Sequence, residues 1–194
     1  MQIEREYYEN GQIRFERYYT DNALHKEDGP AVIYYYDNGD IELQKYLIDG
    51  QLHNGDGPAV IYYYDNGNIQ LERYVIYDQY HRKDKPAIIE YYKNGQIKLK
   101  KYCVNNKYHR EDGPAIIYYN DNNEIKTEYY CIHGDNIHVE EYNNVDKIEL
   151  IELINDAHDM HSLFILKLIT NIKFKNEVNL LELIDSKITM LKLL

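Results

Sequence analysis

The chain has 194 residues, a formal net charge of −11, 23 tyrosines and no tryptophan. This length suffices for one or two domains with a substantial core, while the acidic charge repels phosphate backbones and anionic lipid headgroups. We therefore expect no nucleic-acid ligand, and membrane binding is disfavoured. All tyrosines lie within residues 7–142 and none in the last 52 residues. This composition shift predicts two domains, residues 1–142 and residues 143–194.

The first domain is a tandem repeat with a period of 28 residues. Asn-Gly pairs recur at 10–11, 38–39, 66–67 and 94–95, with Asn122-Asn123 in the fifth copy. Asn-Gly between Tyr- and Ile-rich runs is a strong β-hairpin signal. Two strands per repeat would advance a sheet by about 9–10 Å. The pattern predicts a mainly β fold: an elongated single-sheet array of antiparallel β-hairpin repeats, followed by a small α-helical C-terminal cap.

The pairing register follows from the face that has to be buried. A three-residue loop, Asp37–Gly39, pairs Tyr35 with Ile41 and Ile33 with Leu43, whereas a two-residue loop places apolar residues opposite polar ones. We expect a buried face and a solvated face; the buried one carries Ala31, Ile33, Tyr35, Ile41 and Leu43, and the solvated one Val32, Tyr34, Tyr36, Glu42 and Gln44. Past residue 45 the alternation fails, which indicates either a bulge near Gln44-Lys45 or packing of Tyr46 on the second face.

The variable, second face of the array holds the candidate binding residues. Tyrosine is common in interaction hot spots, so a binding role and plain solvation weigh equally for these side chains. They are Tyr34, Tyr36, Tyr62, Tyr64 and Tyr118.

A second motif, His-x-x-Asp-x-Pro-Ala, recurs four times at the same period. Its polar members are His25, Asp28, His53, Asp56, His81, Asp84, His109 and Asp112. One His and one Asp every 10 Å do not converge as metal ligands must, and a requirement of a turn repeats whereas a catalytic site usually occurs once. We interpret Asp as the acceptor of an Asx-turn and His as a packing or hydrogen-bonding residue of the loop. We expect no catalytic, cofactor or metal site.

The two cysteines, Cys103 and Cys131, occupy one repeat column. Equivalent columns lie too far apart for a disulfide, so we expect free thiols in a reducing compartment. The first six residues lack an apolar run, and no stretch is long enough to span a bilayer. These features predict an intracellular protein of the cytoplasm, or a virion component if the source is viral.

Residues 143–194 carry helical spacing of Leu and Ile. Three helices are indicated, around residues 148–154, 163–172 and 180–191, although the first could also be a strand. Asn155-Asp156 and Asn176 are candidate breaks or caps. The helices would either cap the open edge of the sheet or dock a partner, and capping is favoured because every repeat array has an edge to cover.

The unit Tyr-Tyr-x-Asn-Gly-x-Ile with Gly-x-x-His-x-x-Asp-Gly-Pro-Ala resembles a MORN-type repeat over roughly residues 3–142. The match is to degenerate MORN variants of bacterial and giant-virus proteins, although the usual unit is shorter, richer in Gly and lacks His-x-x-Asp-Gly-Pro. The resemblance implies β-hairpin arrays that bind proteins or, in some members, phospholipids; some bacterial variants are associated with toxin neutralisation. It brings no catalytic residues.

These observations favour a non-catalytic protein–protein interaction or scaffold module, not an enzyme. The alternatives are a phospholipid-associated tether, which liposome flotation would test, and an antitoxin-like immunity protein. A homo-oligomer through the apolar face or the C-terminal helices is a separate expectation.

Overall fold

Each Asn-Gly pair turns the chain between two paired strands, as predicted. In the computed structural model, which describes residues 1–138, 144–174 and 177–193, Tyr36 N donates to Asp40 O at 2.8 Å and Gly39 N to Tyr36 O at 3.0 Å. Gly39 is left-handed, with φ 90°. Asn123 takes the same conformation in the last copy, with φ 62°, because Asn tolerates it best after Gly.

The strands fall into long hairpins and short ones. The long hairpins are built from β1 (Gln2–Tyr7), β2 (Ile13–Thr20), β4 (Val32–Tyr35), β5 (Ile41–Lys45), β8 (Val60–Tyr63), β9 (Ile69–Arg73), β12 (Ile88–Tyr91), β13 (Ile97–Lys101), β16 (Ile116–Tyr119) and β17 (Ile125–Ile132). The short strands are β3 (Ala23–Leu24), β6 (Leu47–Ile48), β7 (Gln51–Leu52), β10 (Val75–Ile76), β11 (Gln79–Tyr80), β14 (Cys103–Val104), β15 (Lys107–Tyr108) and β18 (Asp135–Ile137).

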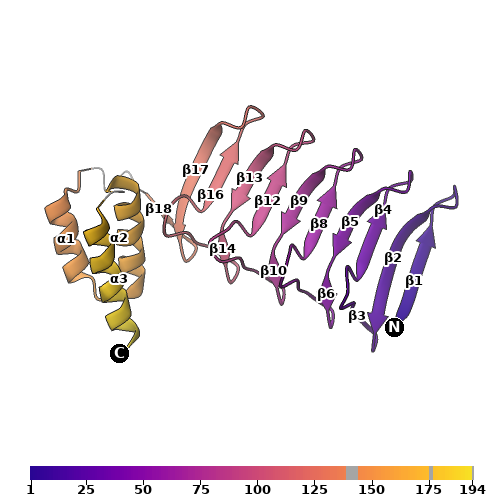
Figure 1. Cartoon of the computed structure of the whole chain (residues 1–194), viewed down its shortest axis with the longest axis horizontal. Coiled ribbons are helices and arrows are strands. Elements are labelled where there is room, and N and C mark those ends of the chain that lie inside the picture. The colour runs from indigo at the N-terminus through magenta and orange to yellow at the C-terminus, as the bar shows by residue number, and fades with distance from the viewer. Residues whose placement is uncertain (139–143, 175–176, 194) are drawn as a thin grey trace. The chain divides into compact units, whose positions relative to one another are not determined.

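The long hairpins form one antiparallel sheet in the order of the sequence. The path is β1-β2-β4-β5-β8-β9-β12-β13-β16-β17-β18, and β3 makes it a sheet of twelve strands. The predicted hairpin array followed by helices is therefore confirmed. The chain divides into two compact units: residues 1–106 with 117–127, and residues 107–116 with 128–194. In the first unit the Asn-Gly turns all lie at one end of the strands, and β6, β10 and β14 lie towards the other end (Figure 1).

The prediction of one buried and one solvated face is wrong beyond the turn. Tyr35 pairs with Ile41 as predicted, but the register then shifts, so that Tyr34 pairs with Leu43 and Ile33 with Gln44. Glu42 is the extra residue of a bulge, which reverses the face of every later side chain in β5. The bulge thus lies earlier than Gln44-Lys45. Each face therefore carries both apolar and polar side chains. Val32 and Ile33, which are adjacent and point to opposite faces, are both buried.

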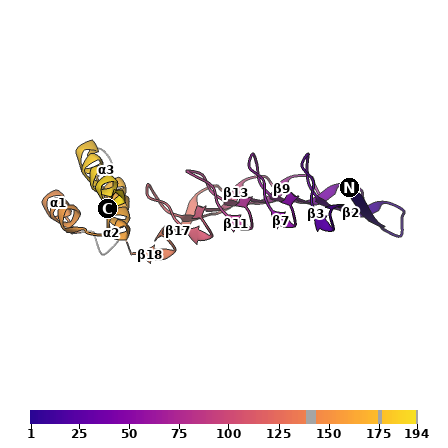
Figure 2. The ribbon, with the colours of Figure 1, turned by 90° about the horizontal axis from the view of Figure 1, so that it is seen from below.

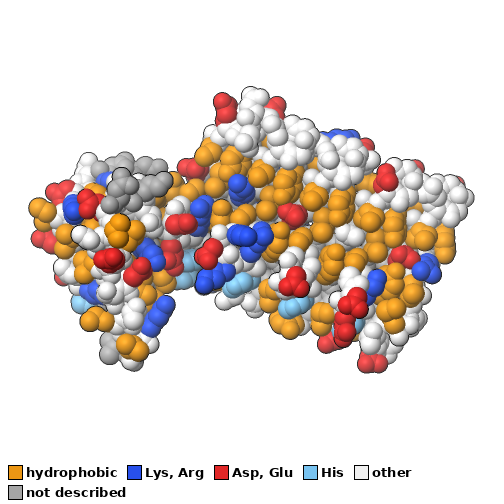
Figure 3. All heavy atoms as spheres, viewed as in Figure 1, with side chains coloured by type: hydrophobic (Ala, Val, Ile, Leu, Met, Phe, Trp, Pro, Cys, Tyr) orange, Lys and Arg blue, Asp and Glu red, His pale blue; other side chains and the backbone are white. Residues whose placement is uncertain are grey.

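We name the two faces by their polar residues. The cationic face carries Arg17, Tyr34 and Lys45, and the acceptor face carries Glu16, Tyr35 and Gln44, together with their 28-residue equivalents in the first unit. On each face, cross-strand partners lie directly opposite one another. Figure 3 shows rows of hydrophobic and tyrosine side chains over the visible face of this sheet, with charged side chains between them.

Short hairpins form a second row of contacts between repeats. Lys26 N donates to Leu47 O at 3.3 Å, and Asn54 N to Val75 O at 3.2 Å. In the first unit the short strands β3, β7 and β11 follow one another in Figure 2 as they do in the sequence. We call the repeated His-x-x-Asp-x-Pro-Ala sequence the anchor motif. Its alanines, Ala31, Ala59, Ala87 and Ala115, are fully buried. Cys103 and Cys131 are buried, form no disulfide and lie in the column of Leu47 and Val75, so they fill apolar packing positions.

The C-terminal segment forms three helices, as predicted. They are α1 (Lys147–Asp156), α2 (Met160–Lys173) and α3 (Val178–Lys192), so the strand alternative for the first is wrong. Asp146 and Asp159 cap α1 and α2 through backbone N–H groups, so the caps precede the helices and Asp156 ends α1. Asn176 and the predicted boundary at 142–143 involve residues outside the described ranges. The helical core is Leu150, Ile154, Ala157, Leu163, Leu166, Leu180, Ile184 and Ile188.

Within the second unit, α2 packs on the last anchor motif. Lys167 Nζ lies 3.0 Å from Glu111 Oε2, and Asn171 Nδ2 donates to Glu111 O at 3.0 Å. The Phe164 ring stands edge-on to the ring of His133, with centroids 5.0 Å apart. The helices are thus attached to the repeat by a charged and aromatic contact.

Candidate binding face

Three of the four anchor histidines, His25, His81 and His109, make a polar contact with the next repeat. His25 Nδ1 lies 2.9 Å from Asp49 Oδ1, and His81 Nδ1 lies 2.9 Å from Asn105 Oδ1. His109 Nδ1 accepts from His133 N at 3.2 Å. The contacted residue is 24 positions further on and has a positive φ in each case. The imidazole therefore stabilises a left-handed turn of the following short hairpin.

The anchor aspartates Asp28, Asp56, Asp84 and Asp112 are exposed. Asp112 Oδ1 accepts from Arg110 Nε at 2.7 Å. In the second anchor it is Asn54 whose side-chain oxygen accepts from the N–H groups of Asp56 and Gly57. In this anchor the Asx-type contact is thus made by the residue after the histidine and not by Asp56. Within residues 1–138, 144–174 and 177–193, no three His, Cys, Asp or Glu side chains gather closely enough to hold a metal ion.

Two of the candidate tyrosines are engaged in contacts between repeats. Tyr36 Oη donates to Tyr63 O at 2.7 Å, and Tyr64 Oη donates to Tyr91 O at 2.8 Å. Tyr8 and Tyr92 make the equivalent contact. Each hydroxyl reaches the backbone of the next repeat, so this column holds neighbouring hairpins in register.

A second tyrosine column runs along the acceptor face, and the sequence reasoning missed its partners. Tyr35 Oη donates to Glu16 Oε2 at 3.0 Å, Tyr63 to Gln44 at 3.0 Å and Tyr91 to Glu72 at 2.7 Å. Glu16 is only 8% exposed. Burial, reinforced by Glu16, raises the pKa of Tyr35 to about 12. The 28-residue spacing of Glu16, Gln44 and Glu72 could have revealed these acceptors in the sequence. It did not, because Gln44 was assigned to the solvated face.

The cationic face carries a straight row of basic residues. Arg17 pairs with Val32, Val32 with Lys45 and Lys45 with Val60; Arg73 then pairs with both Val60 and Ile88. Lys101 is opposite Ile88. Every second strand therefore presents one cation, separated by a β-branched side chain, in a chain whose net charge is −11.

An apolar and aromatic row lies beside these cations. Its cross-strand order is Phe15, Tyr34, Leu43, Tyr62, Leu71, Glu90 and Leu99. Arg17 donates to Tyr34 Oη at 2.6 Å, and this hydrogen bond raises the pKa of Arg17. Tyr34 and Tyr62, both candidate residues, belong to this row; Tyr118 has the equivalent position in β16 and is half-buried.

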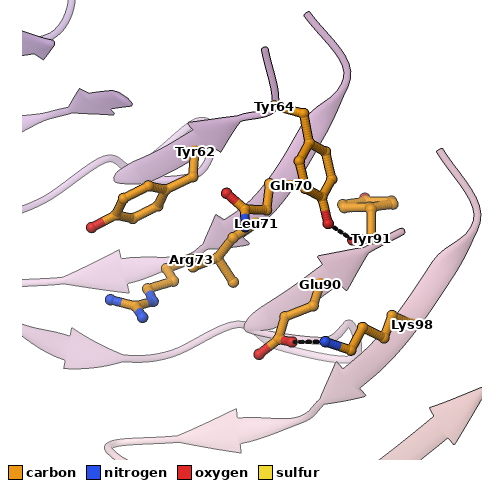
Figure 4. A pocket seen from close by; sticks show the side chains of 8 residues that line it. All are labelled: Tyr62, Tyr64, Gln70, Leu71, Arg73, Glu90, Tyr91 and Lys98. Atoms are coloured by element: carbon orange, nitrogen blue, oxygen red, sulfur yellow. Dashed lines mark hydrogen bonds and ion pairs between the residues drawn. The ribbon is translucent and has the colours of Figure 1, made fainter. Parts of the chain in front are cut away.

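Two shallow hollows open on the cationic face. One, of about 310 Å³, is lined by Tyr62, Tyr64, Gln70, Leu71, Arg73, Glu90, Tyr91 and Lys98. In Figure 4 the ring of Tyr62 and the guanidinium of Arg73 lie on one side, and Glu90 meets Lys98 on the other. The second, of about 250 Å³, is lined by Arg17, Tyr19, Leu24, Val32, Tyr34, Lys45, Leu47 and Leu52. Both combine a tyrosine with a cation, which suits recognition of an anionic group on an apolar chain.

Comparison with protein families confirms the resemblance at the N-terminal hairpin. Residues 3–21 match the MORN repeat variant model, which covers β1 and β2 and is consistent with a MORN-type repeat protein. MORN repeats are generally protein- or membrane-binding modules. Comparisons with curated proteins and with solved structures gave no match. None of the helices in the described segments is long and apolar enough to cross a membrane.

Proposed function

We propose that this chain is a non-catalytic interaction module that binds another protein through the cationic face of its sheet. The observation that carries the proposal is the row of Arg17, Lys45 and Arg73 beside Tyr34 and Tyr62. Tyrosine and arginine are the side chains most enriched at binding hot spots. Three of the four anchor histidines and the acceptor-face tyrosines hydrogen-bond to other repeats, which supports a scaffold role for them and leaves the cationic face for recognition.

Affinity purification from the native cell with matched variants tests the proposal. Lys45→Gln with Arg73→Gln removes two charges from the cationic face. Lys83→Gln with Lys85→Gln removes two charges from an exposed loop and is the control. We expect a polypeptide that the wild type and the control recover and the face variant loses by about tenfold. Equal recovery by all three proteins would refute a role for this face.

The alternatives give different outcomes in the same design. A phospholipid-associated tether would float with phosphatidylserine vesicles and lose flotation in the face variant. An antitoxin-like immunity protein would recover a toxin as its partner. A homo-oligomer would recover tagged copies of the same chain, and light scattering would give a multiple of the 23.3 kDa chain mass.

A further inference from the structure

The spacing of the cations along the sheet sets the spacing of charges in a partner. Arg17, Lys45 and Arg73 occupy β2, β5 and β9, with one strand between successive cations. Neighbouring strands lie about 4.7–4.9 Å apart, so the cations repeat about every 9.4–9.8 Å. A complementary ligand should present a negative charge at the same interval, on one side of its chain.

We infer that the occupant of this face is an acidic polypeptide segment in the polyproline II conformation, an inference that rests on the proposed function. A polyproline II helix has three residues per turn and rises about 3.1 Å per residue, so every third side chain returns to the same side after about 9.3 Å. Three consecutive acidic positions at that period would meet Arg17, Lys45 and Arg73 in turn.

Other backbone conformations fit the row less well. An α-helix returns to the same side after seven residues and about 10.5 Å. This distance exceeds the spacing of the cations, and the mismatch grows with each repeat. A β-strand presents alternate side chains about every 6.6–6.8 Å. Phosphates of a duplex strand are spaced at about 3.4 Å along the axis, so the row would meet only about one in three.

The aromatic row supplies the apolar part of the recognition. Tyr34 and Tyr62 are half-buried and stand beside the cations. Grooves lined by aromatic side chains are the usual binding surface for polyproline II segments, whose proline rings pack between them. Glu90 interrupts the row in the third repeat, 3.7 Å from Lys98, so the preferred contact runs from Arg17 to Arg73.

Charge complementarity is available at the two central cations. Within the described residues neither Lys45 nor Arg73 has a carboxylate within 4.0 Å, whereas Arg17 has Glu4 at 3.5 Å. An incoming carboxylate at Lys45 or Arg73 therefore displaces no internal ion pair. Removing these two cations should weaken binding more than removing any two charges elsewhere.

The test uses two fluorescent peptides with the same composition and charge. One has four Glu-Pro-Pro triplets; the other has four glutamates in a block followed by eight prolines. Fluorescence anisotropy with the full chain should give about tenfold tighter binding of the triplet peptide. Lys45→Gln with Arg73→Gln should abolish the preference for the triplet peptide. Raising salt from about 50 mM to about 300 mM should weaken the same preference. Lys83→Gln with Lys85→Gln should leave it within about twofold.

The outcomes separate this inference from the proposed function. Equal affinity for both peptides, or no binding of the triplet peptide, overturns the polyproline II geometry, while a native partner lost by the face variant keeps the proposed function. Tighter binding of phosphatidylserine vesicles or of single-stranded RNA than of the triplet peptide also overturns it. Circular dichroism and the melting temperature of each variant check that the sheet is intact.

Discussion

The ring of His53 lies 4.2 Å from the ring of Tyr77, and His53 Nδ1 is buried without a hydrogen-bond partner among the described residues. In the next repeat, His81 Nδ1 lies 2.9 Å from Asn105 Oδ1. Tyr77 and Asn105 are equivalent residues with φ of 46° and 48°. The second anchor is therefore the weak connection in a series that is otherwise hydrogen-bonded.

Replacing Tyr77→Asn should stabilise the protein. Asn would supply a partner for the buried Nδ1 of His53 and tolerates a positive φ better than Tyr, while Tyr77 is 56% exposed and loses little burial. We expect a gain of about 1 kcal/mol in the free energy of unfolding in urea. The reciprocal change, Asn105→Tyr, should lower it by a similar amount, and a destabilised Tyr77→Asn would show that His53 serves another purpose.

The acceptor-face tyrosines should make stability sensitive to alkaline pH. The pKa of Tyr35 in the folded protein is about 12, against about 10 in an unfolded chain. The Tyr35 hydroxyl therefore loses its proton at lower pH in the unfolded chain than in the folded protein. Its contribution to stability is complete below about pH 10 and disappears as pH rises towards about 12. Tyr35→Phe should cost about 1.5–3 kcal/mol at pH 8, because the acceptor Glu16 is charged, and this cost should shrink at higher pH.

Tyr7→Phe is the matched control for that experiment, because Tyr7 is 55% exposed. Its difference from the wild type in the free energy of unfolding should be small, because little of its side chain is buried. If Tyr35→Phe behaved like Tyr7→Phe, the hydrogen bond to Glu16 would contribute nothing to stability.

The contact between α2 and the last anchor should weaken in acid. His109, followed by Lys167, lowers the pKa of Glu111 to about 2, against the opposing effect of burial. The contribution of the Glu111 carboxylate to stability is complete above about pH 4.5 and is lost as pH falls towards 2. Glu111→Gln should therefore destabilise the helices at pH 7, and the difference from the wild type should vanish in acid.

Urea unfolding followed by circular dichroism at 222 nm reports on these helices. Glu152→Gln, an exposed residue of α1, is the control and should unfold at the same urea concentration as the wild type at each pH. A Glu111→Gln variant with the wild-type midpoint at pH 7 would show that the ion pair with Lys167 does not hold α2 in place.

Much of the fold follows from the sequence because the repeat multiplies each weak signal. The Asn-Gly turns, the pairing of Tyr35 with Ile41 and the three helices were all predicted from local pattern. The bulge at Glu42 was not, because a single inserted residue leaves the 28-residue period unchanged while it reverses the face of Leu43 and Gln44.

The candidate face was therefore only partly visible beforehand. The column Arg17, Lys45, Arg73 and Lys101 keeps the repeat period in the sequence, yet only the cross-strand pairs place it beside Tyr34 and Tyr62. Similarly, the interrepeat role of Tyr36 and Tyr64 depends on a hydroxyl that reaches a backbone carbonyl 27 residues away, which no local pattern encodes.

Photo-crosslinking in the native cell tests the central claim most directly. A benzophenone side chain at Tyr62 would lie on the cationic face, and one at Ile97, which pairs with Tyr91, would lie on the acceptor face. We predict that irradiation joins a partner polypeptide to the chain modified at 62 and not to the chain modified at 97. Crosslinking from 97 alone, equal crosslinking from both positions, or none from 62 would contradict a protein-binding role for the cationic face.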